Sequence, residues 1–338
     1  MSVKKQYAAV DIAKYVSALL VVCIHTYPLY EVSSLLNTYW IQTVCRIAVP
    51  FFFTISGFFF FRKWSEDEDD NKLILINYLM RLGKIYLIWT LIYFPYVIWD
   101  YHQAGFSILN IISYLRDFLL NGSYYHLWFL PALMLGTVIV FFVYDKKGLS
   151  FTLKLSLVLY IIGYFINVYT NLWQQIPIVS FFFAFFTKVF TTARNGIFFA
   201  PLFISMGLLL TKTKRLPKRT CFIGFIISFV LLVLEVTLYN VLGILRDLTS
   251  MYIALVPAVY FFVSWMLTLK MPYKEKYKVL RQESLLIYTS HILFAKILLN
   301  LFPNAHIVVY FVTLACSQAF ATLVIRYKEQ IPVLEHLL

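Results

Sequence analysis

Apolar runs separated by short polar segments follow one another along almost the whole chain. A helix needs roughly 20 mostly apolar residues to cross the hydrocarbon layer of a bilayer, and the pattern predicts about ten such helices. They are expected at residues 10–28, 44–61, 79–99, 127–144, 151–169, 196–210, 221–240, 251–269, 284–301 and 307–325. The predicted fold class is therefore an all-α integral membrane protein, with one polytopic domain over residues 1–338.

Two other apolar stretches fit this pattern less well. Residues 106–120 are interrupted by Arg116 and Asp117, which favours an amphipathic helix at the membrane interface. Residues 176–190 are too short for an easy crossing, and counting them would move the basic loop 211–219 to the outside. Because Lys and Arg concentrate in cytoplasmic loops, we predict ten crossings with both termini in the cytoplasm.

Composition narrows the class further. Hydrophobic residues make up 61% of the chain and charged residues 13%, whereas a soluble domain has about half apolar and about a quarter charged residues. This excludes a soluble domain of any size. The net charge of +13 lies in short loops and not on one amphipathic face, so no nucleic-acid partner is expected. The four cysteines have no ligand-like spacing, and we expect no metal.

The first apolar run carries charge where charge is costly. Eleven steps of about 100° bring His25 to within about 20° of Lys14 around a helix, with a separation of about 16 Å along its axis. Asp11 lies one turn before Lys14 on the same face. Ionisable side chains facing lipid are unfavourable, so this face should line a protein interior or a watery cavity. We therefore take these residues as functional candidates.

Several other runs bring ionisable side chains to a similar level near the predicted outer ends: Arg46, His126, Arg194, Glu235 and Lys296. Glu235 lies inside the apolar segment LLVLEVTLYN, where a carboxylate needs a partner or a proton. For Arg46, His126 and Arg194, anchoring at the interface is an equal alternative. Tyr288 and His291 lie nearer mid-depth, where a structural hydrogen bond is as well supported as a catalytic role.

Five segments in order carry a resemblance to a known family. The first is Asp11, Lys14 and His25, and the others are RIAVPFFFTISGFF (46–59), YYHLWFLPAL (124–133), RNGIFFAPLFISMG (194–207) and SLLIYTSHIL (284–293). Together they resemble the acyltransferase family 3 membrane proteins, which include bacterial O-acetyltransferases of lipopolysaccharide and other surface glycans. The family usually has Arg where this chain has Lys14. Lys keeps the charge but lacks the bidentate fork of Arg.

The resemblance implies an O-acyltransferase of the bacterial inner membrane. Its donor would be a cytoplasmic acyl-CoA, most simply acetyl-CoA, and its acceptor a hydroxyl of a cell-surface glycan or lipid-linked sugar. His25 would act as general base, Arg46 would stabilise the oxyanion, and Glu235 would orient His25 or pair with an arginine. Lys14, held by Asp11, would bind the donor. Residues expected at the acceptor are Arg194, His126 and Tyr288, with Arg194 a second candidate for the oxyanion.

Two readings from other classes stay open. The chain would be a carrier for a small molecule such as an amino acid, like the membrane half of the serine racemases of vancomycin-resistance clusters. A structural or regulatory membrane subunit is the third reading. An enzyme releases coenzyme A from acetyl-CoA, whereas a carrier moves its cargo without releasing a thiol.

Overall fold

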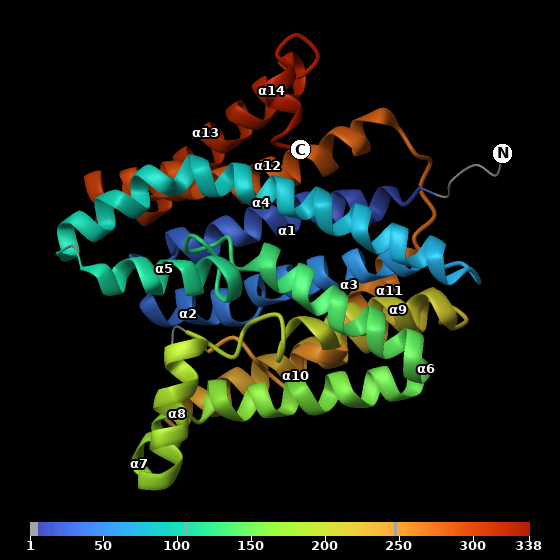
Figure 1. Cartoon of the computed structure of the whole chain (residues 1–338), viewed down its shortest axis with the longest axis horizontal. Helices are drawn as coiled ribbons and strands as arrows, with labels where there is room; N and C mark the ends of the chain where they lie inside the picture. Colours follow the sequence, from blue (N-terminus) through green and yellow to red (C-terminus); the bar gives the residue numbers. More distant parts are fainter. Residues whose placement is uncertain (1–5, 106, 247–248) are drawn as a thin grey trace. The chain divides into compact units, whose positions relative to one another are not determined.

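The computed structural model of the chain describes residues 6–105, 107–246 and 249–338, and over these residues the chain is helical with no strand (Figure 1). The predicted all-α class is confirmed. The helices are α1 (Ala8–Thr26), α2 (Ser34–Gln42), η1 (Cys45–Ile47), α3 (Ala48–Phe61), α4 (Glu68–Ala104), α5 (Ile108–Leu120), α6 (Phe129–Val168), α7 (Thr170–Gln175), α8 (Pro177–Val189), α9 (Ala200–Lys212), α10 (Lys218–Val241), α11 (Leu255–Thr268), α12 (Glu275–Leu301), α13 (His306–Tyr327) and α14 (Pro332–Glu335).

Seven helical stretches among the described residues are long and apolar enough to cross a membrane: α1, residues 34–61, α4, α6, α10, α12 and α13. α6 contains two of the predicted apolar runs. Gly148, with φ 74° and ψ 178°, interrupts the helical backbone between them. Two more predicted runs appear as the shorter apolar helices α9 and α11. The helical membrane-protein class is thus confirmed.

α4 and α12 both begin earlier than their apolar runs predict. α4 begins at Glu68 because the Asp67 side chain accepts a hydrogen bond from the Asp69 amide at 2.8 Å, and acidic residues fill the first turn. α12 begins at Glu275, nine residues before the predicted start at 284. Hydropathy marks the point where a helix becomes apolar, so it misses charged turns that extend the same helix toward water.

The two stretches that did not fit the crossing pattern form α5 and α8, and neither helix contains a buried residue. Phe106, where the first of these stretches begins, lies outside the described residues. α5 and α8 are joined where the Arg116 guanidinium donates to the Lys188 carbonyl at 2.7 Å. Both helices therefore lie on the surface of their unit.

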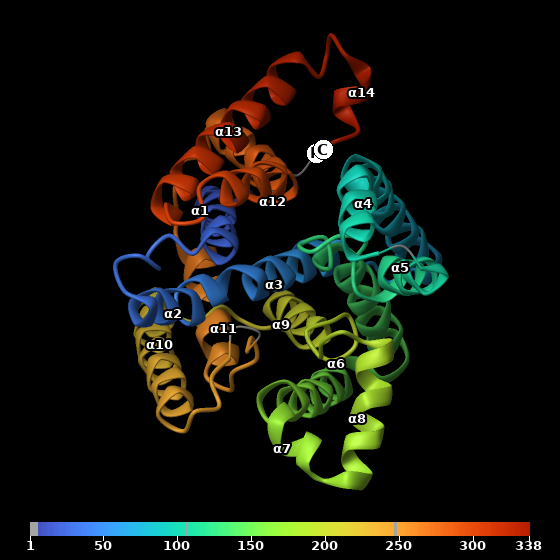
Figure 2. The same ribbon diagram turned by 90° about the vertical axis from the view of Figure 1, so that its left-hand side faces the viewer.

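The chain divides into two compact units. The first comprises residues up to Phe52, Lys214–Tyr239 and Ile253–Leu338, and the second comprises Phe53–Thr213 and Asn240–Tyr252. In the first unit α1 packs along α12 and α13, and Figure 2 shows these three helices side by side. In the second unit α6 packs along α9.

Candidate active site

The N-terminal half of α1 holds the ion pair that the sequence predicts. The Lys14 ammonium lies 3.9 Å from an Asp11 carboxylate oxygen, and only 16% of the Lys14 side chain and 5% of the Asp11 side chain are exposed. The Tyr273 hydroxyl donates to the other Asp11 oxygen at 3.1 Å. Burial, together with this carboxylate, raises the pKa of the Tyr273 phenol, so Tyr273 stays a hydrogen-bond donor. Asp11 thus links the start of α1 to the segment before α12.

In the last turn of α1, His25 lies against a second histidine. The centroids of the His25 and His291 rings are 5.2 Å apart, and the ring planes are tilted by 34°. His291 is fully buried on α12, whereas His25 is half-buried. Tyr288, predicted at the acceptor site, precedes His291 by one helical turn and its ring centroid lies 6.4 Å from that of His291. The structure therefore brings His25, His291 and Tyr288 together.

Arg46 is buried in the same unit, with 6% of its surface exposed. It lies in η1, which packs against α1. The Arg46 Nε donates to the Gln42 Oε1 at 2.7 Å, so an amide one turn earlier holds the guanidinium. This hydrogen bond fixes the position of the Arg46 guanidinium beside α1.

Glu235 has other partners than the sequence suggested. Its Oε1 accepts hydrogen bonds from the Tyr239 hydroxyl at 2.6 Å and the Ile253 amide at 2.9 Å, and its Oε2 accepts from the Ala254 amide at 2.8 Å. These amides immediately precede α11, where a carboxylate is favourable. The expectation that Glu235 orients His25 or pairs with an arginine is therefore wrong. Glu235 on α10 instead forms hydrogen bonds with the segment that begins α11.

The other two predicted acceptor residues, His126 and Arg194, belong to the second unit. His126 is buried, and its ring meets Tyr93 edge to face with centroids 4.9 Å apart. The Arg194 guanidinium lies 4.6 Å from the centroid of Trp128, the residue that precedes α6. These two side chains are thus held by aromatic rings, while His25, Arg46 and Tyr288 lie in the first unit.

A polar chain that was not predicted from the sequence joins α1, α12 and α13. The Tyr15 hydroxyl donates to the side-chain oxygen Oε1 of Gln318 at 2.8 Å. The side-chain nitrogen Nε2 of Gln318 donates to the Glu283 carboxylate at 2.7 Å. Glu283 is buried, with 9% of its surface exposed. A lone glutamine in an otherwise apolar run was the signal for this network, because such an amide needs partners inside a membrane. The network ties the three helices together.

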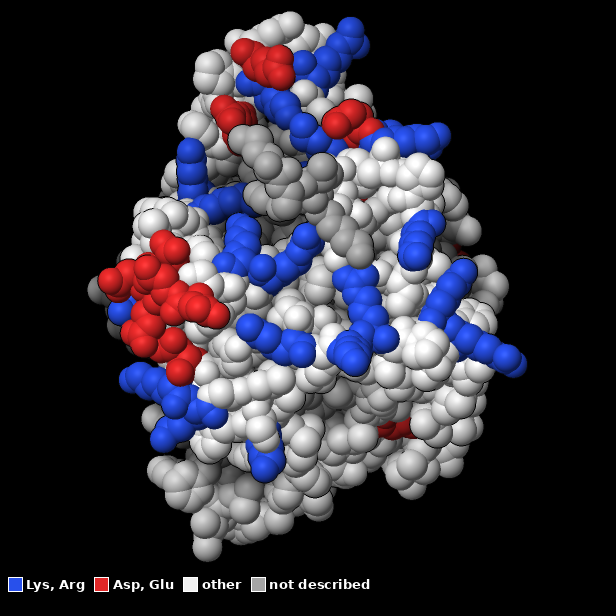
Figure 3. All heavy atoms as spheres, turned by 90° about the vertical axis from the view of Figure 1, so that its right-hand side faces the viewer, with Lys and Arg blue, Asp and Glu red and all other residues white. Residues whose placement is uncertain are grey.

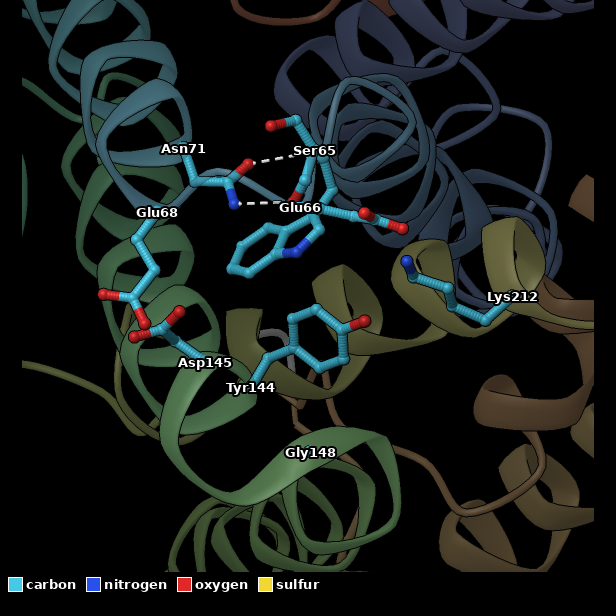
Figure 4. A pocket seen from close by; sticks show the side chains of 9 residues that line it. Ser65, Glu66, Glu68, Asn71, Tyr144, Asp145, Gly148 and Lys212 are labelled. Carbon is cyan, nitrogen blue, oxygen red and sulfur yellow. Dashed lines mark hydrogen bonds between the residues drawn. The ribbon is translucent and has the colours of Figure 1, made fainter.

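A pocket of about 650 Å³ opens in the second unit, with none of the predicted site residues in its lining. Figure 4 shows Tyr144 in the middle, Glu68 and Asp145 on one side and Lys212 on the other, and Trp64 also lines the pocket. Two hydrogen bonds of 2.9 Å between Asn71 and the Ser65 backbone fix the loop at its rim. The charged side chains of this pocket are exposed, so it is an open surface feature and not an enclosed site.

A model of the acyltransferase domain of family 3 matches residues 7–326 of the chain. The chain belongs to this family. The match covers the helices of the ion pair and of the histidine pair, so this family member is a multi-pass helical membrane protein.

Curated relatives carry a different name. An amino-acid racemase of Enterococcus faecalis is 30% identical over 214 residues, which are 63% of this chain and 30% of that protein. A serine/alanine racemase of Enterococcus gallinarum is 32% identical over 285 residues, 83% of this chain and 40% of that protein. The chain therefore spans less than half the length of these relatives. No solved structure matches it.

Proposed function

We propose that this acyltransferase moves an acyl group, most simply the acetyl group of acetyl-CoA, to a hydroxyl of a cell-surface glycan or lipid-linked sugar. The observation that carries the proposal is the placement of two ionisable side chains on α1, with a mostly buried ammonium in its N-terminal half and a half-buried imidazole near its C-terminal end. A transferase that takes its donor from the cytoplasm and its acceptor from outside needs a cation and a base at these two levels. Family membership supports the same assignment.

The orientation in the membrane is part of this proposal. We place the protein in the bacterial inner membrane with ten crossings and both termini in the cytoplasm, counting α6 twice at Gly148 and including α9 and α11. Figure 3 shows many exposed Lys and Arg side chains, and basic residues favour the cytoplasmic side of a membrane. Several groups of Asp and Glu lie among them, the largest on the left of the view.

The chemical step follows from the side chains of the first unit. His25 takes the proton of the acceptor hydroxyl while the hydroxyl oxygen attacks the thioester carbon, and Arg46 stabilises the negative oxygen of the tetrahedral intermediate. The carbon–sulfur bond then breaks, and the sulfur leaves as coenzyme A thiol with the proton from His25. Lys14 binds a donor phosphate as a point charge, and Asp11 keeps the ammonium in place. Tyr288 lies beside the reacting groups. We assign no role in the chemical step to His126 or Arg194.

Two assays test the proposal. Membranes that contain the protein are given acetyl-CoA, and thiol release is followed for the wild type, for His25→Gln and for a matched control, His102→Gln, which replaces an exposed histidine. We expect release in the wild type and the control and loss in His25→Gln. Mass spectrometry of surface glycans should show an acetyl increment that disappears with the same variant. Unchanged glycans and thiol release in His25→Gln would overturn the proposal.

A carrier is the second candidate, because the curated relatives are named as racemases of amino acids, serine and alanine among them. By that likeness the chain would move such an amino acid across the membrane. Sealed vesicles loaded with labelled serine or alanine separate the two functions. Label movement without thiol release indicates the carrier, and thiol release without label movement indicates the transferase.

A further inference from the structure

The fully buried residue His291 faces the proposed general base from a neighbouring helix. It lies on α12, and its ring centroid is 5.2 Å from that of His25 on α1. His25 is half-buried and His291 is fully buried, so His25 is the more accessible ring of the pair. His291 is thus in the position from which a second group supports a catalytic histidine.

The backbone of α12 fixes which ring nitrogen of His291 carries a proton. The His291 Nδ1 lies 2.8 Å from the Tyr288 carbonyl oxygen and 3.1 Å from the Ile287 carbonyl oxygen. Carbonyl oxygens only accept hydrogen bonds, so Nδ1 must be the donor. In the neutral ring Nε2 then carries the lone pair. Both carbonyls belong to the helix that bears His291, so the ring orientation is set by α12 itself.

We propose that His291 is a positioning residue for His25, an inference that rests on the function proposed above. After His25 accepts the proton of the acceptor hydroxyl, and until it gives that proton to the coenzyme A sulfur, its ring carries a positive charge. The neutral ring of His291, with a lone pair on Nε2, stabilises that charge and restricts rotation of the His25 ring. A carboxylate commonly fills this role beside a catalytic histidine. A neutral imidazole fills it without placing a second charge inside the membrane.

The arrangement also explains why Glu235 is not needed for this purpose. Its two oxygens are hydrogen-bonded to Tyr239 and to the amides that precede α11. The group that contacts the His25 ring comes from α12 instead, the helix that packs along α1.

Three substitutions at His291 separate positioning from packing. His291→Phe keeps an aromatic ring but removes both nitrogens. His291→Asn keeps an amide that can donate to the carbonyls near Nδ1 but leaves nothing at the position of Nε2. His291→Gln places an amide oxygen near the position of Nε2 and restores an acceptor. A purely structural role would rank these variants by their thermal stability, whereas positioning ranks them by the presence of that acceptor.

The full-length protein is assayed in its native membranes, which carry the acceptor, with acetyl-CoA as the donor. We expect kcat for thiol release to fall about 10-fold to 100-fold in His291→Phe and His291→Asn, the range known for partners that orient metal-binding histidines. His291→Gln should recover to within about fivefold of the wild type, and KM for acetyl-CoA should not change. Equal kcat in His291→Phe and the wild type, or losses that follow thermal stability, would overturn the proposal.

A second readout does not depend on activity. Nitrogen-15 NMR of the histidine rings, recorded for the full-length protein in nanodiscs, should show His291 protonated at Nδ1. The His25 ring signals should move in His291→Phe and return toward the wild-type positions in His291→Gln. Unmoved His25 signals in His291→Phe would disprove the pairing. If the signals move but no membrane releases thiol, the pairing stands and the acyltransferase function fails.

Discussion

Two groups of helices in this protein pack through different kinds of residue. In the first unit, α1, α12 and α13 enclose polar side chains: the Asp11–Lys14 pair, the Tyr15–Gln318–Glu283 chain and the two histidines. In the second unit, α3 and α9 meet through glycines: a Cβ added at Gly57 would overlap the Ile204 carbonyl, and one at Gly207 would overlap the Thr54 carbonyl. Small residues permit such close approach of membrane helices.

The difference separates chemistry from support. Buried polar groups are costly in a membrane protein, and a fold keeps them where they do something that apolar packing cannot do. A glycine at a helix contact permits close packing and supplies no chemical group for catalysis. Substitutions in α1 should therefore change catalysis more than folding, and substitutions at the α3–α9 contact should change folding more than catalysis.

The largest expected effect is that of His25→Gln. Removing a general base costs about 10²-fold to 10⁴-fold in rate, and we expect kcat for thiol release from acetyl-CoA to fall within this range. The amide side chain of Gln is compatible with the half-buried position, so the thermal unfolding midpoint should stay near that of the wild type. Unfolding of this variant would instead make His25 a packing residue and erase the contrast between the two helix groups.

Gly207→Val should give the reverse result. The added side chain meets the backbone of Thr54 and Phe58, which cannot move aside as a flexible side chain would. Overpacking of this kind costs about 1–3 kcal/mol or more. We expect a lower unfolding midpoint in detergent and less protein in the membrane. The surviving folded protein should keep the wild-type KM for acetyl-CoA, and Gly83→Val, at a position with open space, is the matched control.

Lys14→Ala should act on donor binding. Loss of one phosphate-binding cation and of its pairing with Asp11 should raise KM for acetyl-CoA about tenfold, or about 1.4 kcal/mol. Lys14→Arg restores the charge and should restore KM, since Arg binds phosphate at least as well as Lys. Kinetics at varied acetyl-CoA give both numbers. A fall in kcat with unchanged KM would place Lys14 outside the donor site.

Glu235→Gln should have the smallest effect. Gln keeps one oxygen acceptor but loses the charge-assisted hydrogen bonds to the amides before α11, at a cost of about 1–2 kcal/mol in stability. The kcat of the folded variant should match that of the wild type. A loss of more than about tenfold in kcat with normal stability would return Glu235 to the catalytic machinery.

The sequence predicted well what one helix determines alone. The 3.6-residue period placed Asp11 and Lys14 on one face, and their ion pair is present. Contacts between helices could not be predicted, because the sequences of α1 and α12 do not determine how the two helices are aligned along each other. The His25–His291 contact and the Tyr15–Gln318 hydrogen bond are of this kind. Glu235 was misassigned for a related reason: the amides that it binds come from an irregular segment, whose path a hydropathy pattern does not give.

Acyl transfer from the cytoplasmic side to an outer acceptor is the central claim, and one labelling measurement tests it most directly. Native membrane vesicles of known orientation receive acetyl-CoA with a labelled acetyl group on the face to which the N-terminus is assigned, and the label bound to glycan is then quantified. We predict covalent label on the glycan in the wild type, matched by thiol release, and neither in His25→Gln. Glycan label that is equal in both proteins, or absent from both while labelled serine or alanine crosses the membrane, would contradict the account.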